Sequence, residues 1–348
     1  MNLREIKIIP IFESVRAIDI SDNEYFGPNY KKYISNSSLS LINPAQGGSP
    51  QIYYEGLSAH QKFSDSLVFG SAVHCLTLQP DDFVLAENVN RPTAKAGLMA
   101  DELFPIFCER GKIEFEDIVK ASDKIDYYKG KMDDKKASTL LEKCNDYFWS
   151  RKRYEKEESL FTGPSKEPIY LDDKSRDKLR KCLESIQNNQ DIQKILHPEG
   201  IISNPESNNE ICILLDVKAI YPDGNERILS LKAKVDNYTF DEESNLLVVN
   251  DLKTTGHNVS EFQNSFYKFH YYRQMAMYGW MLRILLGKDE SVNIKSNMLL
   301  ISTIPPFNSG VFKVLNTHIS RGMSEFSELL KRVAYHEQYG YDIEESKL

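Results

Sequence analysis

The stretch SLKAKVDNYTFDEESNLLVVNDLKTT, from Ser230 to Thr255, decides the fold. It holds two β-rich segments, and turn residues from Asp241 to Asn245 separate them. The second segment is apolar from Leu246 to Val249 without alternation, which is typical of a strand buried on both faces of a sheet. We therefore expect two neighbouring strands of a buried sheet.

More strands and helices surround this stretch once the composition changes after Pro205. Alternation and turn signals predict strands over residues 210–221, 228–240, 246–255, 296–304 and 310–319, and helices over 260–287 and 320–339. Because one helix stands between the third and fourth strands, the sheet acquires a crossover connection. Residues 205–340 are therefore predicted to form a mixed central sheet with helices against it.

The first half of the chain is mostly helical. Residues 1–34 carry few periodic signals, and Ser37 or Ser38 is the expected N-cap of a short helix that ends at Asn43. Further helices are predicted over 70–79, 114–130, 134–158, 172–188 and 190–196. We interpret residues 1–348 as one α/β domain in which 91–200 form a large helical insertion.

Composition limits the class of protein. The chain has 348 residues, 41% of them hydrophobic, which is enough for a sizeable core. It lacks an apolar run of about 18 residues and an N-terminal signal, so we expect a cytoplasmic protein without a membrane partner. A net charge of −8 counts against nonspecific coating of nucleic acid. Its five cysteines are scattered, which argues against a disulfide framework, a zinc site or an iron–sulfur cluster.

Three polar residues stand at the ends of the two central strands. Asp251 and Lys253 are two residues apart and therefore project to the same face, whereas Leu252 points into the core. An antiparallel neighbour would bring Asp236 beside them. Two carboxylates suit Mg²⁺, which prefers oxygen ligands, and a nearby lysine can serve an attacking water or stabilise developing charge. This grouping fits hydrolysis of a phosphodiester.

Four motifs then occur in a characteristic order: GSAVH (Gly70–His74), KVD (Lys234–Asp236), DLKTT (Asp251–Thr255) and QMAMY (Gln274–Tyr278). The ordered set resembles the RecB-like branch of the PD-(D/E)xK nucleases, and in particular the RecE-type, exonuclease VIII-like enzymes of phages and prophages. The segments Ile34–Leu39 and Pro80–Phe83 are also similar. The resemblance covers roughly residues 30–290 and implies a restriction-endonuclease-like core.

The resemblance also implies a set of metal ligands. Asp236 and Asp251 would bind Mg²⁺, with Mn²⁺ as a substitute, and the Leu252 carbonyl would add a backbone oxygen. His74 would be a further ligand or a phosphate contact. Glu210, which opens the first strand of the core, matches an acidic position of the family and would be another ligand.

Three further residues receive catalytic roles from the same resemblance. Lys253 would serve the attacking water. Gln274 and Tyr278 lie four residues apart and so share one helix face, which in the family borders the active site and DNA. This chain departs from the family pattern in two ways, because the middle acid is aspartate and the proline of the family name is absent before Asp236.

The predicted function is a Mg²⁺-dependent exonuclease that acts on ends of linear double-stranded DNA, 5′ to 3′, and makes single strands for recombination. The resemblance implies a homo-oligomer and, as a partner, a single-strand annealing recombinase. One alternative is a structure-specific or single-strand-end nuclease of the same family. Another is a DNA-binding recombination accessory protein without catalysis.

Overall fold

The computed structural model describes residues 3–58, 65–80, 85–86, 89–125, 127–158, 168–198 and 208–341. The chain divides into two compact units. The first consists of Met1–Gln61 and Ser185–Leu348, and the second is Lys62–Glu184. Among the described residues, no helix has both the length and the apolar character needed to span a bilayer.

The first unit is built on a seven-stranded sheet in the order β1-β3-β4-β5-β6-β7, with β2 also paired to β3. The strands are β1 (Lys7–Pro10), β2 (Arg16–Ile18), β3 (Asn209–Ile220), β4 (Glu226–Asp241), β5 (Leu246–Thr255), β6 (Asn293–Ser302) and β7 (Ser309–Val314). Only β5 and β6, among these paired strands, run parallel, because helices connect them. The expected mixed sheet flanked by helices is present, and it is mostly antiparallel.

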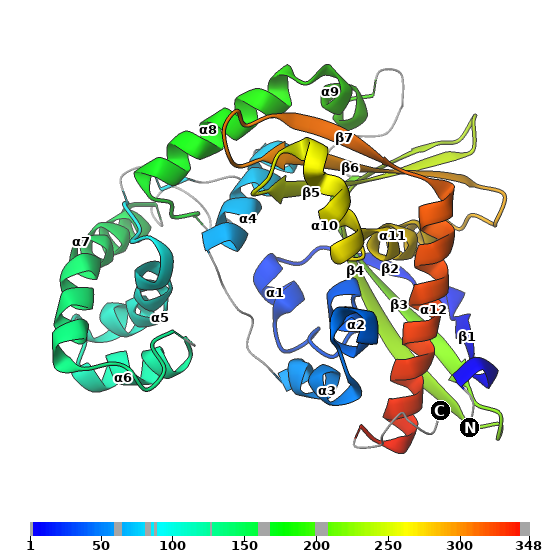
Figure 1. Cartoon of the computed structure of the whole chain (residues 1–348), viewed down its shortest axis with the longest axis horizontal. Helices are drawn as coiled ribbons and strands as arrows, with labels where there is room; N and C mark the ends of the chain where they lie inside the picture. The colour runs from blue at the N-terminus through cyan, green and yellow to red at the C-terminus, as the bar shows by residue number, and fades with distance from the viewer. Residues whose placement is uncertain are drawn as a thin grey trace. The chain divides into compact units, whose positions relative to one another are not determined.

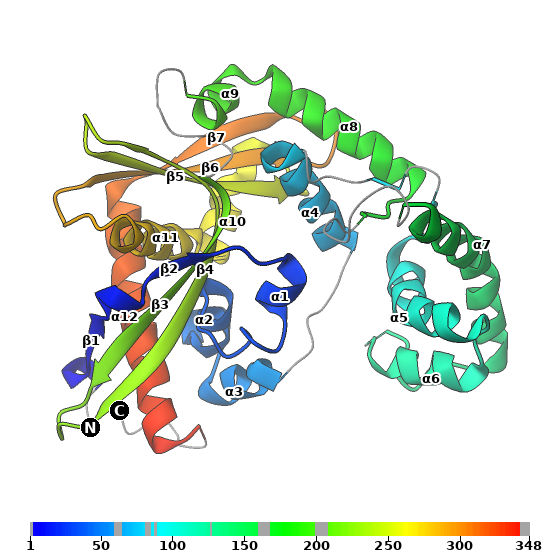
Figure 2. The ribbon, with the colours of Figure 1, turned by 180° about the vertical axis from the view of Figure 1, so that it is seen from behind.

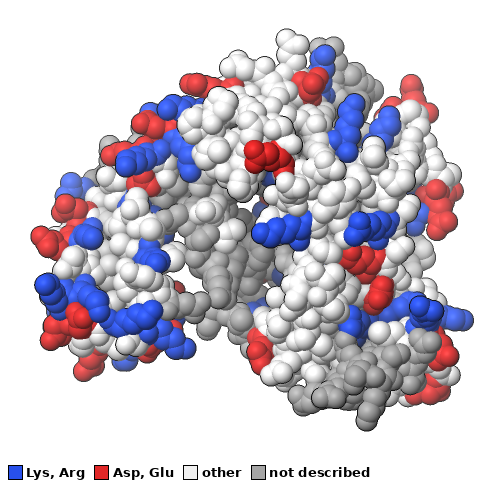
Figure 3. All heavy atoms as spheres, in the orientation of Figure 1, with Lys and Arg blue, Asp and Glu red and all other residues white. Residues whose placement is uncertain are grey.

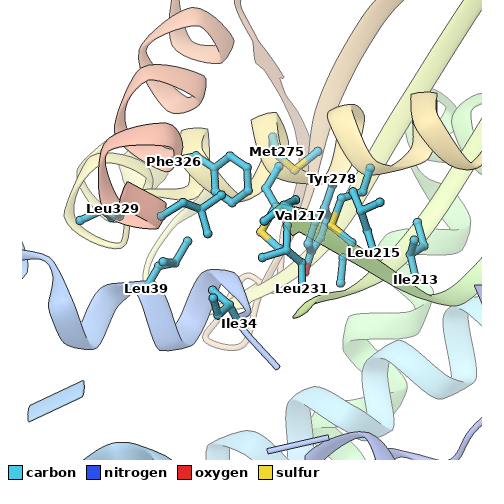
Figure 4. Close-up of a cluster of buried hydrophobic side chains, with 14 of the residues drawn as sticks. Ile34, Leu39, Ile213, Leu215, Val217, Leu231, Met275, Tyr278, Phe326 and Leu329 are labelled. Atoms are coloured by element: carbon cyan, nitrogen blue, oxygen red, sulfur yellow. The ribbon is translucent and has the colours of Figure 1, made fainter. Parts of the chain in front are cut away.

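Helices pack against this sheet (Figures 1 and 2). Those of the first unit are α1 (Asp22–Phe26), α2 (Asn36–Ile42), α3 (Pro50–Ser58), α9 (Gln190–Leu196), α10 (Phe262–Lys268), α11 (Tyr271–Leu285) and α12 (Asn316–Tyr339). Helix α8 (Asp173–Asn188) runs across the division between the units. Figure 4 shows the core, where Ile213, Leu215, Val217 and Leu231 of the strands meet Met275 and Tyr278 of α11 and Phe326 and Leu329 of α12.

The second unit is helical. It contains α4 (Asp65–Leu78), α5 (Ala94–Arg110), α6 (Phe115–Asp123) and α7 (Asp134–Glu158). Apolar side chains of α5, α6 and α7 form a separate buried cluster. The predicted helices 134–158, 172–188 and 190–196 are confirmed almost to the residue, whereas the one expected over 114–130 is shorter.

Several predicted boundaries are wrong for local reasons. The N-cap of α2 is Ser35, because its hydroxyl accepts from the Ser38 amide and Ser38 Oγ accepts from the Ser35 amide in a capping box. The helix expected over 260–287 is two helices, since His270 adopts a left-handed conformation with φ 52°. The last strand ends at Val314, and the residues that follow begin α12.

Other elements were not predicted, or were predicted only in part. Residues 1–34 hold the short strands β1 and β2 and the helix α1, which lack enough length to show a period. Helix α5 was not predicted, and α4 begins five residues before Gly70, where the prediction placed its start. Residues 81–83 of the Pro80–Phe83 segment lie outside the described residues.

A buried ionic network ties α11 to α2 and α12. The Arg273 side chain is fully buried, and its guanidinium donates to Glu325 Oε1 at 2.7 Å and to Asn36 Oδ1 at 2.8 Å. Glu325 also accepts from Tyr272 Oη at 2.7 Å and contacts His270 Nδ1 at 2.6 Å. Burial opposes the charge on Glu325, but the Tyr272 bond and the positive charges of Arg273 and His270 hold its pKa below the usual range.

We expect Glu325→Ala to destabilise the first unit strongly. Removal of the carboxylate leaves the Arg273 charge buried without its counter-ion, which costs about 3–5 kcal/mol. The free energy of unfolding in urea measures this loss. Glu328→Ala, on the exposed side of α12, is the matched control and should change stability by less than about 0.5 kcal/mol. Equal unfolding midpoints for the two variants would contradict the assigned role of the network.

Candidate active site

Three acidic residues stand in register on neighbouring strands. In the pairing of β3 with β4, Asn209 faces Asn237 and Ile211 faces Val235, so Glu210 lies opposite Asp236. In the pairing of β4 with β5, Asn237 faces Asn250, which places Asp251 one step further, opposite Asp236. Residues that face one another across strands project to the same side of a sheet. We call Glu210, Asp236 and Asp251 the acidic row.

Glu210 and Asp236 are close enough to share a cation. A carboxylate oxygen of each lies within 4.8 Å of the other. Glu210 has φ 53°, an unusual value for a residue with a side chain, and its carboxylate forms an ion pair with Lys234 Nζ at 2.5 Å. A strained residue held by its surroundings is common at functional sites.

Asp251 is fully buried and held from two sides. Lys253 Nζ lies 2.6 Å from its Oδ2, and Gln274 Nε2 donates to its Oδ1 at 2.7 Å. The same Gln274 nitrogen donates to Tyr278 Oη at 3.0 Å. Gln274 therefore links Tyr278 to the acidic row, and the two residues lie on one face of α11, the shared face that their spacing predicted.

Asp236 is tied to the next strand through its side chain. Its Oδ2 accepts from the backbone N–H of Leu252 at 2.7 Å, while the Leu252 side chain is buried in the core, as expected. The backbone of Leu252 thus lies beside the acidic row. A metal-binding role for the Leu252 carbonyl stays a prediction.

The charges of the row act on the groups around it. Burial opposes a charge on Lys253, but the carboxylates of Asp251 and Asp236 outweigh this effect and raise the pKa of Lys253 above its usual range. Lys253 is therefore a cation at neutral pH. Burial, and then the charge of Asp251, raise the pKa of Tyr278, which stays a neutral phenol.

An asparagine ladder lies directly beside the acidic row and was not predicted. Asn237 Nδ2 donates to Asn209 Oδ1 at 2.7 Å, and Asn250 Nδ2 donates to Asn237 Oδ1 at 2.7 Å. Asn297 Nδ2 extends the ladder to Asn250 Oδ1 at 2.9 Å. Each asparagine precedes or follows a residue of the row on its strand, apart from Asn297 on β6. The ladder fixes the register that aligns the acids, and only the pairing of strands reveals it.

Two more side chains were also missed, one beside Lys253 and one further along β4. Tyr271 precedes Gln274 by three residues on α11, and its ring centroid lies 5.5 Å from Lys253 Nζ. Lys232, two residues before Lys234 on β4, is buried, and its Nζ donates to the Tyr25 carbonyl at 2.6 Å. Helical spacing from Gln274 and strand spacing from Lys234 are the signals that could have identified them.

His74 lies on α4 in the second unit and is partly buried. The other predicted site residues, Glu210, Asp236, Asp251, Leu252, Lys253, Gln274 and Tyr278, all belong to the first unit. The role of His74 as a ligand or phosphate contact stays a prediction.

Comparisons with known proteins give little further identification. The sequence matches no protein-family model and no curated protein. A crystal structure from Eubacterium rectale, described as "Putative exonuclease", is similar with a TM-score of 0.49 and 11% sequence identity, over 95% of this chain and 91% of that one. At this distance the likeness assigns neither a family nor an activity to the chain.

Lys232→Met should remove a pH dependence of stability. Burial lowers the pKa of Lys232 to about 8, against about 10.4 for an ordinary lysine. Between these values the unfolded chain binds more protons than the folded chain, so stability rises with pH across this window. Below about pH 8 the folded state carries the full cost of the buried charge.

The free energy of unfolding, measured in urea from about pH 8 to about pH 10, checks this expectation. The rise in stability should be smaller in Lys232→Met than in the unsubstituted protein. Lys295→Met, at an exposed position of β6, is the control and should keep the rise. The same slope in Lys232→Met as in the control would contradict the buried position assigned to this amine.

Proposed function

We propose that this protein is a metal-dependent deoxyribonuclease whose active site is the acidic row with Lys253. One observation supports the proposal above others: Glu210, Asp236 and Asp251 occupy facing positions on β3, β4 and β5, and Lys253 Nζ lies 2.6 Å from Asp251. Carboxylates beside a lysine are the groups that phosphodiester hydrolysis needs.

The donor set fits a hard divalent cation. The row offers three carboxylates, and the two lysines paired with them, Lys234 and Lys253, leave negative charge in excess. Carboxylate oxygens suit Mg²⁺ and Mn²⁺, whereas a zinc site would call for nitrogen or sulfur ligands. Glu210, Asp236 and Asp251 would hold the ion, with the Leu252 carbonyl as a further ligand. When bound, Mg²⁺ would stabilise charge on a phosphate and make a coordinated water more acidic.

The remaining residues position these groups. Lys253, as a cation, can orient the attacking water by hydrogen bonding and stabilise negative charge on the phosphate. Gln274 fixes the Asp251 carboxylate through one hydrogen bond and the Tyr278 hydroxyl through another. Because both groups are buried, each bond restricts the orientation of its acceptor. Tyr278 would border the bound strand.

For the substrate we propose the ends of linear double-stranded DNA, digested 5′ to 3′ to yield single strands for recombination. The resemblance to RecE-type nucleases supports this choice, and it also supports a homo-oligomer and an annealing recombinase as partner. A structure-specific or single-strand-end nuclease would use the same acidic row.

The alternative to an enzyme is a non-catalytic DNA-binding accessory protein. Such a protein needs a basic surface for phosphate contacts. Figure 3 shows lysine and arginine interspersed with aspartate and glutamate over the coloured part of one face. The mixed charge of this face, together with an intact acidic row, favours the nuclease.

We expect the purified protein to digest linear duplex DNA in Mg²⁺. Asp251→Asn and Lys253→Met should each lower the rate by about 100-fold or more, because each removes a charge used in the transition state. Gel analysis of linear, circular and single-stranded DNA measures the activity and separates the substrate classes. Glu242→Gln, on the exposed β4–β5 turn, is the control and should digest normally. Intact linear duplex after incubation with the unsubstituted protein would contradict the exonuclease.

Chelation should abolish the activity. We expect EDTA to stop digestion and added Mg²⁺ or Mn²⁺ to restore it, because the oxygen donors of the row suit both ions. Ca²⁺ should not restore it, since this larger ion takes more ligands in a looser geometry. Digestion that persists in EDTA would contradict the metal mechanism, whatever substrate is cut.

A further inference from the structure

The segment Tyr25–Tyr33, which we call the aromatic arch, reads YFGPNYKKY. It has four aromatic residues, two lysines and no acid, although the whole chain has a net charge of −8. Interleaved aromatic and basic residues are typical of surfaces that bind single-stranded nucleic acid, because bases stack on the rings and phosphates pair with the amines.

Both ends of the arch are fixed to strand β4. At the first end, Lys232 Nζ donates to the Tyr25 carbonyl at 2.6 Å. Just beyond the second end, the Ile34 carbonyl accepts from the Lys232 amide at 2.9 Å, and the Ile34 amide donates to the Ser230 carbonyl at 2.8 Å. The side chain and backbone of Lys232 thus hold the two ends together, so the arch is anchored at closely spaced points.

Phe26 is the exposed aromatic side chain at the start of the arch. Phe26 is 47% exposed, whereas Tyr25 is buried. The Tyr25 ring packs edge-on against Phe26 with 5.0 Å between centroids, and Lys232 Nζ lies 5.8 Å from the Phe26 centroid. Tyr25 and Lys232 therefore pack against one side of Phe26, while the rest of this side chain is open to solvent. Lys32 is exposed further along the arch.

The residue that anchors the arch stands on the same strand, and on the same face of it, as Asp236 of the acidic row. Lys232 precedes Asp236 by four residues on β4, which is a distance of about 13 Å along a strand. Burial and then the charge of Asp251 raise the pKa of Tyr278, and the Tyr25 hydroxyl acts on it in the same direction. Gln274 Nε2 links the Tyr278 hydroxyl to the Asp251 carboxylate. Both views of the ribbon place α1, which carries Tyr25 and Phe26, beside α2 (Figures 1 and 2).

We propose that Phe26 stacks on an unpaired base of the DNA strand while Lys32 contacts its backbone, so that the arch holds a single-stranded segment beside the acidic row. This inference rests on the proposed nuclease function and names the form of DNA that the site engages. Inside a duplex, base faces are covered by their neighbours, so the arch selects unpaired bases.

The test measures binding separately from cleavage. The anisotropy of a fluorescein-labelled oligothymidylate, with Ca²⁺ in place of Mg²⁺, reports affinity for single strands. We expect Phe26→Ala to weaken binding by roughly 5- to 140-fold, the range that corresponds to one lost base stack. Phe26→Trp should bind at least as well as the unsubstituted protein. Phe12→Ala is the matched control, because Phe12 is another exposed phenylalanine of the first unit, 61% exposed.

Two further measurements examine the contacts themselves. An oligonucleotide that carries 2-aminopurine should lose fluorescence on binding, because stacking quenches this base, and Phe26→Ala should reduce the loss. Lys32→Gln should lower the slope of log affinity against log salt by about 0.7, the contribution of one phosphate contact to a single strand. The proposal would be overturned if Phe26→Ala bound single strands as tightly as the unsubstituted protein and quenched 2-aminopurine to the same extent. An equal loss of affinity in Phe12→Ala would overturn it as well.

The outcomes separate this inference from the proposed function. If the protein digests DNA in Mg²⁺ and Phe26→Ala binds single strands normally, the arch has no stacking role and the nuclease stands. If Phe26→Ala loses binding but the unsubstituted protein digests no DNA, the nuclease fails and the arch is a binding site alone. If the folded, unsubstituted protein does not bind single strands, the proposed role of the arch in DNA binding is wrong. The arch is then interpreted as a surface for a protein partner.

Discussion

The register of β3, β4 and β5 is the constraint on which the site depends. A shift of one residue in either pairing would turn an acid of the row to the opposite face of the sheet. Two sets of interactions oppose such a shift: the apolar residues of the strands must face the core, and the asparagine ladder joins Asn209, Asn237, Asn250 and Asn297 across four strands. Because the ladder lies next to the acidic row, its hydrogen bonds fix the strand register beside the three acids that the site must align.

Helix α11 packs beside the acidic row and contacts it through Gln274. A buried ionic network sets the position of that helix. Arg273 points to Glu325 and α2, while its neighbour Gln274 points to Asp251. Two adjacent residues of α11 therefore have different roles: Arg273 fixes the position of the helix, and Gln274 contacts the acidic row. The left-handed conformation of His270 starts the helix at Tyr271 and so decides which of its residues face the sheet.

The acidic row also shows how buried charge is tolerated. Each pairing of a carboxylate with a lysine or an amide offsets part of the cost of its burial. Lys234 and Lys253 meet the two outer acids, and the backbone amide of Leu252 meets the central one. A divalent cation would offset the charge that remains, which connects the stability of the folded site to the chemistry we propose for it.

The sequence by itself determined most of the long elements, although not α5, and the chemistry available to the site. The apolar run at Leu246–Val249 and the spacing of Asp251 and Lys253 are local patterns, because a strand has a period of two. The pairing of Gln274 with Tyr278 is equally local, because helical period brings residues four apart to one face. Tertiary structure alone decided what depends on contacts distant in the chain. Strand pairing set Glu210 opposite Asp236. The break between the helices at His270 lies in the buried network around Arg273, since both residues contact Glu325. Lys232 anchors the aromatic arch. No period along the sequence encodes these contacts, because their partners lie as far as 237 residues away.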